Sequence, residues 1–131
     1  NSYNIAPTTR VPVVRINREG ERVILNNVWG LIPHWAKDKT GSAKLNNARG
    51  ETVHEKPSFR TAFKKFRCLI PASGYYEWQA PPEGSGSRKQ PFYIYPNETH
   101  YFAMAGVCDH WIAYSGQTGQ RFWLKLDTVS G

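Results

Sequence analysis

One carboxylate is distinguished by its neighbours, because Glu77 lies between Tyr76 and Trp78 in a segment of mostly apolar and aromatic side chains. Burial among aromatic rings raises the pKa of a carboxyl group toward neutrality. Such a group can take up and release protons during a reaction near neutral pH. The alternative is structural, since Glu77 would also be satisfied by a buried ion pair with a residue such as Arg49.

The two thiols and four imidazoles do not form a metal-binding pattern. Cys68 and Cys108 are far apart in the chain and lack Cys-x-x-Cys spacing. No ligand spacing relates the histidines, which are His34, His54, His100 and His110. Because nucleotide-binding motifs are missing as well, we expect no metal and no cofactor. We expect both cysteines to be reduced, buried thiols, so an enzyme with either thiol as its nucleophile is the least favoured class.

Positive charge is concentrated in the first 78 residues. They contain 13 Lys and Arg against 6 Asp and Glu, a net of +7, whereas residues 79–131 contain four of each. Between Lys37 and Arg67, nine basic residues face three acidic ones. A basic surface on a folded domain favours a polyanionic partner such as nucleic acid. The alternative is a solvated basic face without a partner.

Short alternating apolar runs between turn residues predict a sheet-dominated α+β fold with five or six mostly antiparallel strands. Strands are expected at residues 11–16, 22–25, 27–32, 67–78, 91–95 and 101–107. The turn at residues 17–20 is a hairpin signal, in which Gly20 can adopt a positive φ. Residues 79–90 are rich in Gly, Pro and Ser and are expected to form a flexible loop.

A different periodicity occurs between residues 58 and 67, where apolar side chains recur at helical spacing, at Phe59, Ala62, Phe63 and Phe66. Ser58 is the expected N-cap of this helix. At 100° per residue, three basic side chains fall beside the apolar stripe: Arg60, Lys64 and Arg67. The helix would pack its phenylalanines on the sheet and present a basic ridge, although a plain amphipathic surface helix has the same pattern.

The composition fits a single folded domain over residues 1–131. Of the 131 residues, 40% are hydrophobic and 14% are aromatic, which supplies enough apolar side chains for a core. No apolar run approaches the ~20 residues that span a bilayer, and the first residues lack the pattern of a signal peptide. We therefore expect a soluble protein.

Four motifs occur in order along the chain: YNIAPT at 3–8, WGLIPHW at 29–35, NNARGET at 46–52 and CLIPASGYYEW at 68–78. Together with KQPFY at 89–93, they closely resemble the SRAP family, the SOS-response-associated peptidase domains that process abasic sites in DNA. The resemblance covers about residues 3–110. After His110 it fades, and the segment FWLKL at 122–126 does not match the family clearly.

The resemblance implies a β-rich α+β domain with a mostly antiparallel, barrel-like sheet and short peripheral helices. It also implies binding of single-stranded DNA and a covalent crosslink to abasic sites. In the family, the α-amine of an N-terminal cysteine condenses with the ring-opened sugar aldehyde, and its thiol then closes a thiazolidine. The same cysteine is linked to removal of a short leader. The resemblance therefore implies two activities, a lyase that processes abasic sites and a cysteine autopeptidase.

The reacting cysteine of the family has no counterpart in this sequence. The chain begins at Asn1, where the family has preceding residues that start with that cysteine. Neither Cys68 nor Cys108 can replace it, because a thiazolidine requires the amine and the thiol on one residue. The downstream His-x-Arg-Met-Pro-like motif of the family is missing too. We therefore expect a domain without its N-terminal and C-terminal family segments: a truncated domain, a decayed copy, or a sequence with gaps.

The resemblance assigns roles to individual residues. Asn47 matches the asparagine that positions the reacting sugar, for which an amide that both donates and accepts is suited. Glu77 matches the proton shuttle, and Arg49 matches an arginine that contacts DNA phosphate. Trp35, presented from a loop, would stack on a base, and Pro7 would shape the loop that lines the cleft. Charge alone adds four phosphate candidates: Lys56, Arg60, Lys64 and Lys65.

Structural roles remain open for several of these residues. Asn47 is also a common turn residue, and Arg49 would equally pair with Glu51 or Glu77. Trp29 and Trp78 lie within strand patterns and are expected in the core.

The leading hypothesis is a DNA-repair protein of the DNA damage response that captures abasic sites in single-stranded DNA. It would act as a monomer without a membrane or a metal, in the cytoplasm and nucleoid of a bacterium or in a eukaryotic nucleus. The alternative is a non-catalytic module that only binds single-stranded DNA.

Overall fold

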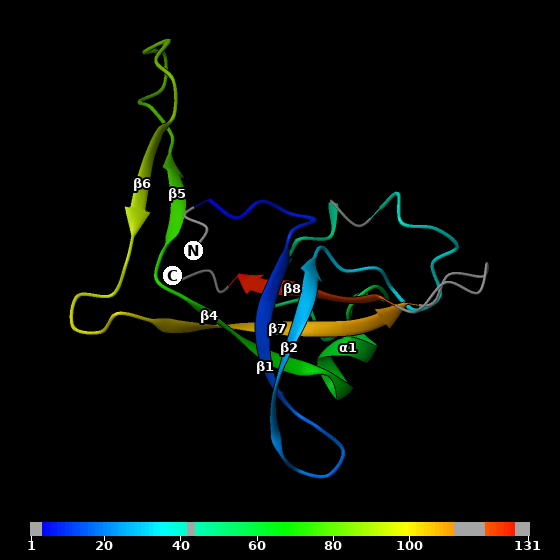
Figure 1. The fold of residues 1–131 in the computed structure, drawn as a ribbon. Coiled ribbons are helices and arrows are strands. Elements are labelled where there is room, and N and C mark those ends of the chain that lie inside the picture. Colours follow the sequence, from blue (N-terminus) through cyan, green and yellow to red (C-terminus); the bar gives the residue numbers. More distant parts are fainter. Residues whose placement is uncertain (1–3, 42–43, 112–119, 128–131) are drawn as a thin grey trace. The chain divides into compact units, whose positions relative to one another are not determined.

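The computed structural model describes residues 4–41, 44–111 and 120–127, and over these ranges it contains eight strands and one short helix (Figure 1). The chain divides into two compact units, one of Asn1–Ile70 with Met104–Gly131 and the other of Pro71–Ala103. The expectation of a single domain over residues 1–131 stays a prediction. Within the described ranges, no helix is long and apolar enough to cross a membrane.

The first unit opens with the predicted hairpin of β1 (Arg10–Ile16) and β2 (Arg22–Trp29). The strands pair antiparallel from Arg10↔Val28 to Ile16↔Arg22. Gly20 in the connecting turn has a φ of 83°, as its position predicts. Strand β2 joins two expected segments but ends at Trp29 rather than at residue 32, because Gly30, with a φ of 120°, turns the chain away from the sheet.

The sheet of this unit curls back on itself, which confirms the mostly antiparallel, barrel-like arrangement. Its other strands are β4 (Arg67–Ala72), β7 (Phe102–Trp111), β8 (Gln120–Asp127) and β3 (Asn47–Arg49). The strand order is β2-β1-β4-β7-β8-β3, and an additional parallel pairing joins the end strand β2 to β8, the last strand but one. Strands β7 and β8 pair antiparallel, whereas β3 pairs with β8 in parallel.

The structure has more strands than the sequence predicted. Strand β3 has three residues, which is too short to show an alternating pattern. The single expected strand at residues 67–78 is interrupted at Ser73 and Gly74 and becomes β4 and β5 (Tyr75–Gln79). Strand β8 was not expected, because it follows the last motif that the sequence analysis used.

Helix α1 (Arg60–Lys65) packs its apolar stripe inward, as predicted. It contributes to a buried cluster of Leu31, Ala48, Val53, Phe59, Ala62 and Val107. The expected N-cap is wrong, because Phe59 holds that position and no side chain caps the helix. The backbone N–H groups of Phe59 and Arg60 both bond to the carbonyl of Lys56 at 2.9 Å. These two N–H groups at the start of the helix thus have a backbone acceptor in the preceding turn and do not need a serine side chain as a cap.

A second buried cluster contains both cysteines, together with Val11, Val13 and Ile70. Neither Cys68 nor Cys108 forms a disulfide, which confirms the expected reduced, buried thiols. Asn27, which is fully buried, donates a hydrogen bond from Nδ2 to Cys108 Sγ at 3.2 Å. The hydrogen bond to Cys108, and then burial, raise the pKa of the Cys68 thiol well above its usual range.

The second unit is built on the antiparallel pair of β5 and β6 (Gln90–Ile94). Tyr93 packs between Tyr76, with ring centroids 5.2 Å apart, and Tyr95, at 5.7 Å. Trp78 lies on the same face and is 58% exposed, so its expected place in the core is wrong. A two-stranded sheet has no second layer of its own that would bury this face.

Gly74 provides a first test of this unit, because a Cβ atom at that position would overlap the ring of Tyr93. We expect Gly74→Ala to displace the exposed end of the ring and to destabilise the β5–β6 pair by about 1 kcal/mol, the lower end of the usual effect of overpacking. Amide hydrogen exchange of the two strands would measure the loss. Gly41→Ala is the matched control, since nothing lies within 4 Å of its added methyl group. Equal exchange rates in the two variants would contradict the steric role of Gly74.

Cys68 provides a second test through its raised pKa. The folded protein holds the thiol proton at a pH at which the unfolded chain releases it, above ~8.5. The free energy of unfolding should therefore fall as the pH rises through this range, and the fall should be smaller in Cys68→Ala. Iodoacetamide should modify the folded protein far more slowly than the urea-unfolded protein. Rapid alkylation of the native thiol would contradict the prediction.

Candidate functional site

Trp29, at the end of β2, connects three of the four motifs by hydrogen bonds. Its carbonyl accepts a bond from Thr8 N at 2.7 Å, and its own N–H donates to Thr9 O at 2.9 Å. Its indole Nε1 donates to Asn46 O at 2.8 Å. The turn that contains Pro7 and the residue that precedes Asn47 are therefore both tied to one tryptophan. The strand pattern predicts Trp29 in the core, and its side chain is half-buried beside the cysteine cluster.

The turn around Pro7 has an unusual backbone. Thr8 has a φ of 75°, in the left-handed region that β-branched residues avoid. Such a conformation costs roughly 1–3 kcal/mol and persists only when its surroundings enforce it. Here the enforcing contacts are the bond from Thr8 N to Trp29 and the bond from Thr9 N to Ala6 O at 3.2 Å. Pro7 is half-buried in this turn, and its expected place beside a cleft stays a prediction.

Asn47 and Arg49 project from the same side of β3. The strand alternates, so that Ala48 is buried in the cluster shared with α1, while its two neighbours are exposed. The segment that leads into this strand is held by a backbone hydrogen bond from Leu31 N to Leu45 O at 2.8 Å. The competing ion pair of Arg49 with Glu51 does not form. The amide and the guanidinium are thus adjacent and open to a ligand.

Trp35 is exposed on the loop that follows β2, as predicted, with 59% of its surface accessible. The loop is held by Asp109 of β7, a buried carboxylate that the sequence analysis did not identify. Its Oδ2 accepts a hydrogen bond from His34 N at 3.2 Å and lies 3.5 Å from His34 Nδ1. The sequence does contain a sign of this role, because Asp109 is an acidic residue within the apolar run of β7. Asp109 therefore fixes the residue immediately before the exposed indole.

Glu77 lies in the second unit, on β5, where it pairs with Phe92. It is exposed, so the expected burial among aromatic rings is wrong. The reason is the strand period: Tyr76 and Trp78 point to the face opposite to Glu77 and cannot enclose its carboxylate. Because Asn47 and Arg49 belong to the other unit, a role shared with Glu77 stays a prediction.

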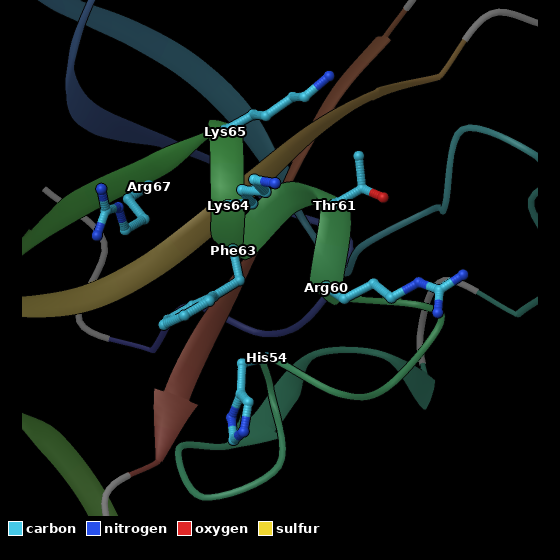
Figure 2. A pocket seen from close by; sticks show the side chains of 7 residues that line it. All are labelled: His54, Arg60, Thr61, Phe63, Lys64, Lys65 and Arg67. Atoms are coloured by element: carbon cyan, nitrogen blue, oxygen red, sulfur yellow. The ribbon is translucent and has the colours of Figure 1, made fainter.

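The charged candidates Lys56, Arg60, Lys64 and Lys65 are all exposed. The last three line an open hollow of about 640 Å³ on the first unit, together with His54, Thr61, Phe63 and Arg67 (Figure 2). Lys56 is not among its lining residues. Over the described ranges, no group of three or more His, Cys, Asp or Glu side chains is arranged to hold a metal ion.

The indole bond of Trp29 can be tested by Trp29→Phe, which keeps an aromatic ring and removes the donor. The carbonyl of Asn46 would lose its partner in a partly buried place, so we expect the free energy of unfolding to fall by about 1–3 kcal/mol. Trp78→Phe is the matched control, because that exposed side chain should contribute no more than about 0.5 kcal/mol. Urea unfolding measures both, and equal midpoints would contradict a special role for Trp29.

The family model described as SOS response associated peptidase (SRAP) matches residues 1–126. The match therefore extends beyond His110, where the resemblance seemed to fade. The abasic site processing protein YoaM of Bacillus subtilis is 39% identical over 116 residues, which cover 88% of this chain and 49% of the relative. The abasic site processing protein HMCES of Xenopus tropicalis is 38% identical over 105 residues, which cover 72% of this chain and 30% of that protein.

Solved structures agree with these matches. A protein of Bacteroides thetaiotaomicron superposes with a TM-score of 0.76 at 35% identity, over 92% of this chain and 50% of that one. A protein of Bordetella bronchiseptica gives the same TM-score at 27% identity, over 93% of this chain and 58% of its own. The chain thus spans about half the length of YoaM and of the two solved structures, and about a third of HMCES. By its sequence and its fold, it belongs to the SRAP family.

Proposed function

We propose that the complete protein captures abasic sites in single-stranded DNA as a covalent adduct. The observation that carries the proposal is the SRAP family match over residues 1–126, together with relatives that are named abasic site processing proteins. A role in DNA damage follows from these names. The single-stranded substrate, the chemistry and the residue roles below are our inference.

In the proposed reaction, the nucleophile is an N-terminal cysteine that the family supplies and that is not among these residues. Its α-amine adds to the aldehyde of the ring-opened sugar, and loss of water gives an imine. The thiol then adds to the imine carbon and its proton passes to the nitrogen, which closes a thiazolidine. Every atom of the two reactants is accounted for, with water as the only product released, so no oxidant or reductant is required.

This chain would contribute groups that hold the sugar and move protons. The amide of Asn47 suits the aldehyde oxygen and the hemiaminal, because it donates and accepts without titrating. The guanidinium of Arg49, exposed beside it, suits the adjacent phosphate. Glu77 would carry the proton to the departing water, and the exposed ring of Trp35 would stack on a base. We expect the protein to be a monomer. We expect it to act in the cytoplasm and nucleoid of a bacterium or in a eukaryotic nucleus.

A non-catalytic single-stranded DNA-binding module is the second candidate. The observation that favours it is the set of exposed basic side chains, which bind phosphate without any cysteine. It predicts salt-sensitive DNA binding and no covalent product.

Incubation of the complete protein with abasic single-stranded DNA distinguishes the two functions. We expect an adduct that survives heating in detergent, and its absence would exclude the covalent proposal. Glu77→Gln should slow adduct formation by at least about tenfold, in line with the loss of a general acid, while binding of unmodified DNA is retained. Glu83→Gln, which removes an exposed carboxylate of the same unit, is the matched control. If both variants react at the wild-type rate, Glu77 is not the proton shuttle.

A further inference from the structure

The hollow beside α1 collects side chains from three successive segments of the chain (Figure 2). His54 comes from the turn after β3, Arg60 and Lys64 come from the helix, and Arg67 is the first residue of β4. The helical spacing predicts that Arg67 continues a basic ridge of the helix. The helix ends earlier, at Lys65, but Arg67 still lines the same hollow as the other two.

The charge of the hollow is one-sided. Four of its lining side chains are lysine or arginine, the imidazole of His54 adds a fifth basic group, and none is acidic. The carboxylate of Glu55, the residue after His54, lies 3.3 Å from its imidazole, measured from Oε1 to Nε2. Among the described acidic residues, none forms an ion pair with the two arginines or the two lysines. Lysine and arginine side chains that line one hollow and have no ion pair attract an anion.

The two uncharged residues that line the hollow, Phe63 and Thr61, anchor the helix in the core and add a hydrogen-bond donor. Phe63 is half-buried and packs against the cluster of Leu31, Ala48 and Val107, so the helix is anchored below the charges. The hydroxyl of Thr61 can donate a hydrogen bond. Guanidinium groups bind phosphate oxygens in a bidentate manner, and lysines add point charges. An open hollow of this composition suits the repeated phosphates of a nucleic-acid backbone.

The hollow is separate from the exposed side of β3. Ala48 points into the core that also contains Ala62 of α1, so Asn47 and Arg49 point away from that core. Neither of them lines the hollow. A phosphate bound beside α1 is therefore held independently of one bound by Arg49.

We propose that the basic hollow formed by His54, Arg60, Lys64, Lys65 and Arg67 is a second phosphate-binding site. It contacts the sugar–phosphate backbone of DNA on a surface distinct from Asn47 and Arg49. The proposal rests on the proposed function only in taking DNA as the partner, and it does not depend on the covalent reaction. Its effect is to add affinity that is independent of base sequence.

The test measures binding of the complete protein to a fluorescent oligothymidine without an abasic site, over a range of salt concentrations. Arg60→Gln/Lys64→Gln removes two cations from the hollow. Loss of two phosphate contacts should reduce the slope of log affinity against log salt by about 1.4, or 0.7 for each contact. Arg60→Lys/Lys64→Arg keeps both charges and should retain most of the slope. Arg18→Gln/Arg22→Gln is the matched control, because it removes two exposed charges outside the hollow.

A slope that falls in the hollow variant and not in the control supports the second site. A wild-type slope in the hollow variant, with its fold confirmed by circular dichroism, overturns it. An equal fall of the slope in the hollow variant and the control also overturns it, because net charge alone would then explain the salt dependence. These outcomes are read without any adduct, so failure of the covalent proposal is seen separately, as the absence of a crosslink to abasic DNA.

Discussion

The hydrogen bonds of Trp29 are the constraint on which the candidate site depends. Its backbone holds the strained turn at Thr8, and its indole holds the carbonyl of Asn46. These contacts join segments that are far apart in the sequence at the end of one strand. Because a half-buried carbonyl without a partner is unfavourable, the indole fixes the residue before Asn47 as well as filling space. Three of the four sequence motifs thus meet at one residue.

Functional side chains are presented at the surface by neighbours that are buried. Ala48 anchors β3 in the core, which leaves Asn47 and Arg49 exposed on the other side. Asp109 anchors the backbone of His34, which leaves Trp35 exposed. In the first case the exposed groups flank a buried residue of the same strand, and in the second a buried carboxylate holds the backbone N–H of the residue before the exposed indole. Such preorganisation suits a site that must hold a flexible ligand.

The positive charge of the first 78 residues is divided between separate surfaces. Arg49 lies on the exposed side of β3, whereas the side chains around α1 form a hollow of their own. The common core cluster, which contains Ala48 and Ala62, lies between β3 and α1 and separates the two. A net charge of +7 therefore does not describe one continuous binding face. Electrostatic attraction still acts over the whole unit, because it extends about 10 Å at ordinary ionic strength.

The sequence alone determined the family, the predominance of strands, the β1–β2 hairpin and the apolar stripe of α1. These features depend on local spacing and turn chemistry, which are present in the order of the residues. Burial was decided only by the tertiary structure: Glu77 and Trp78 are exposed, because the pair of β5 and β6 has no second layer of its own. The role of Asp109 was likewise settled by long-range packing, which brings it to His34 and leaves no periodic signal in the sequence.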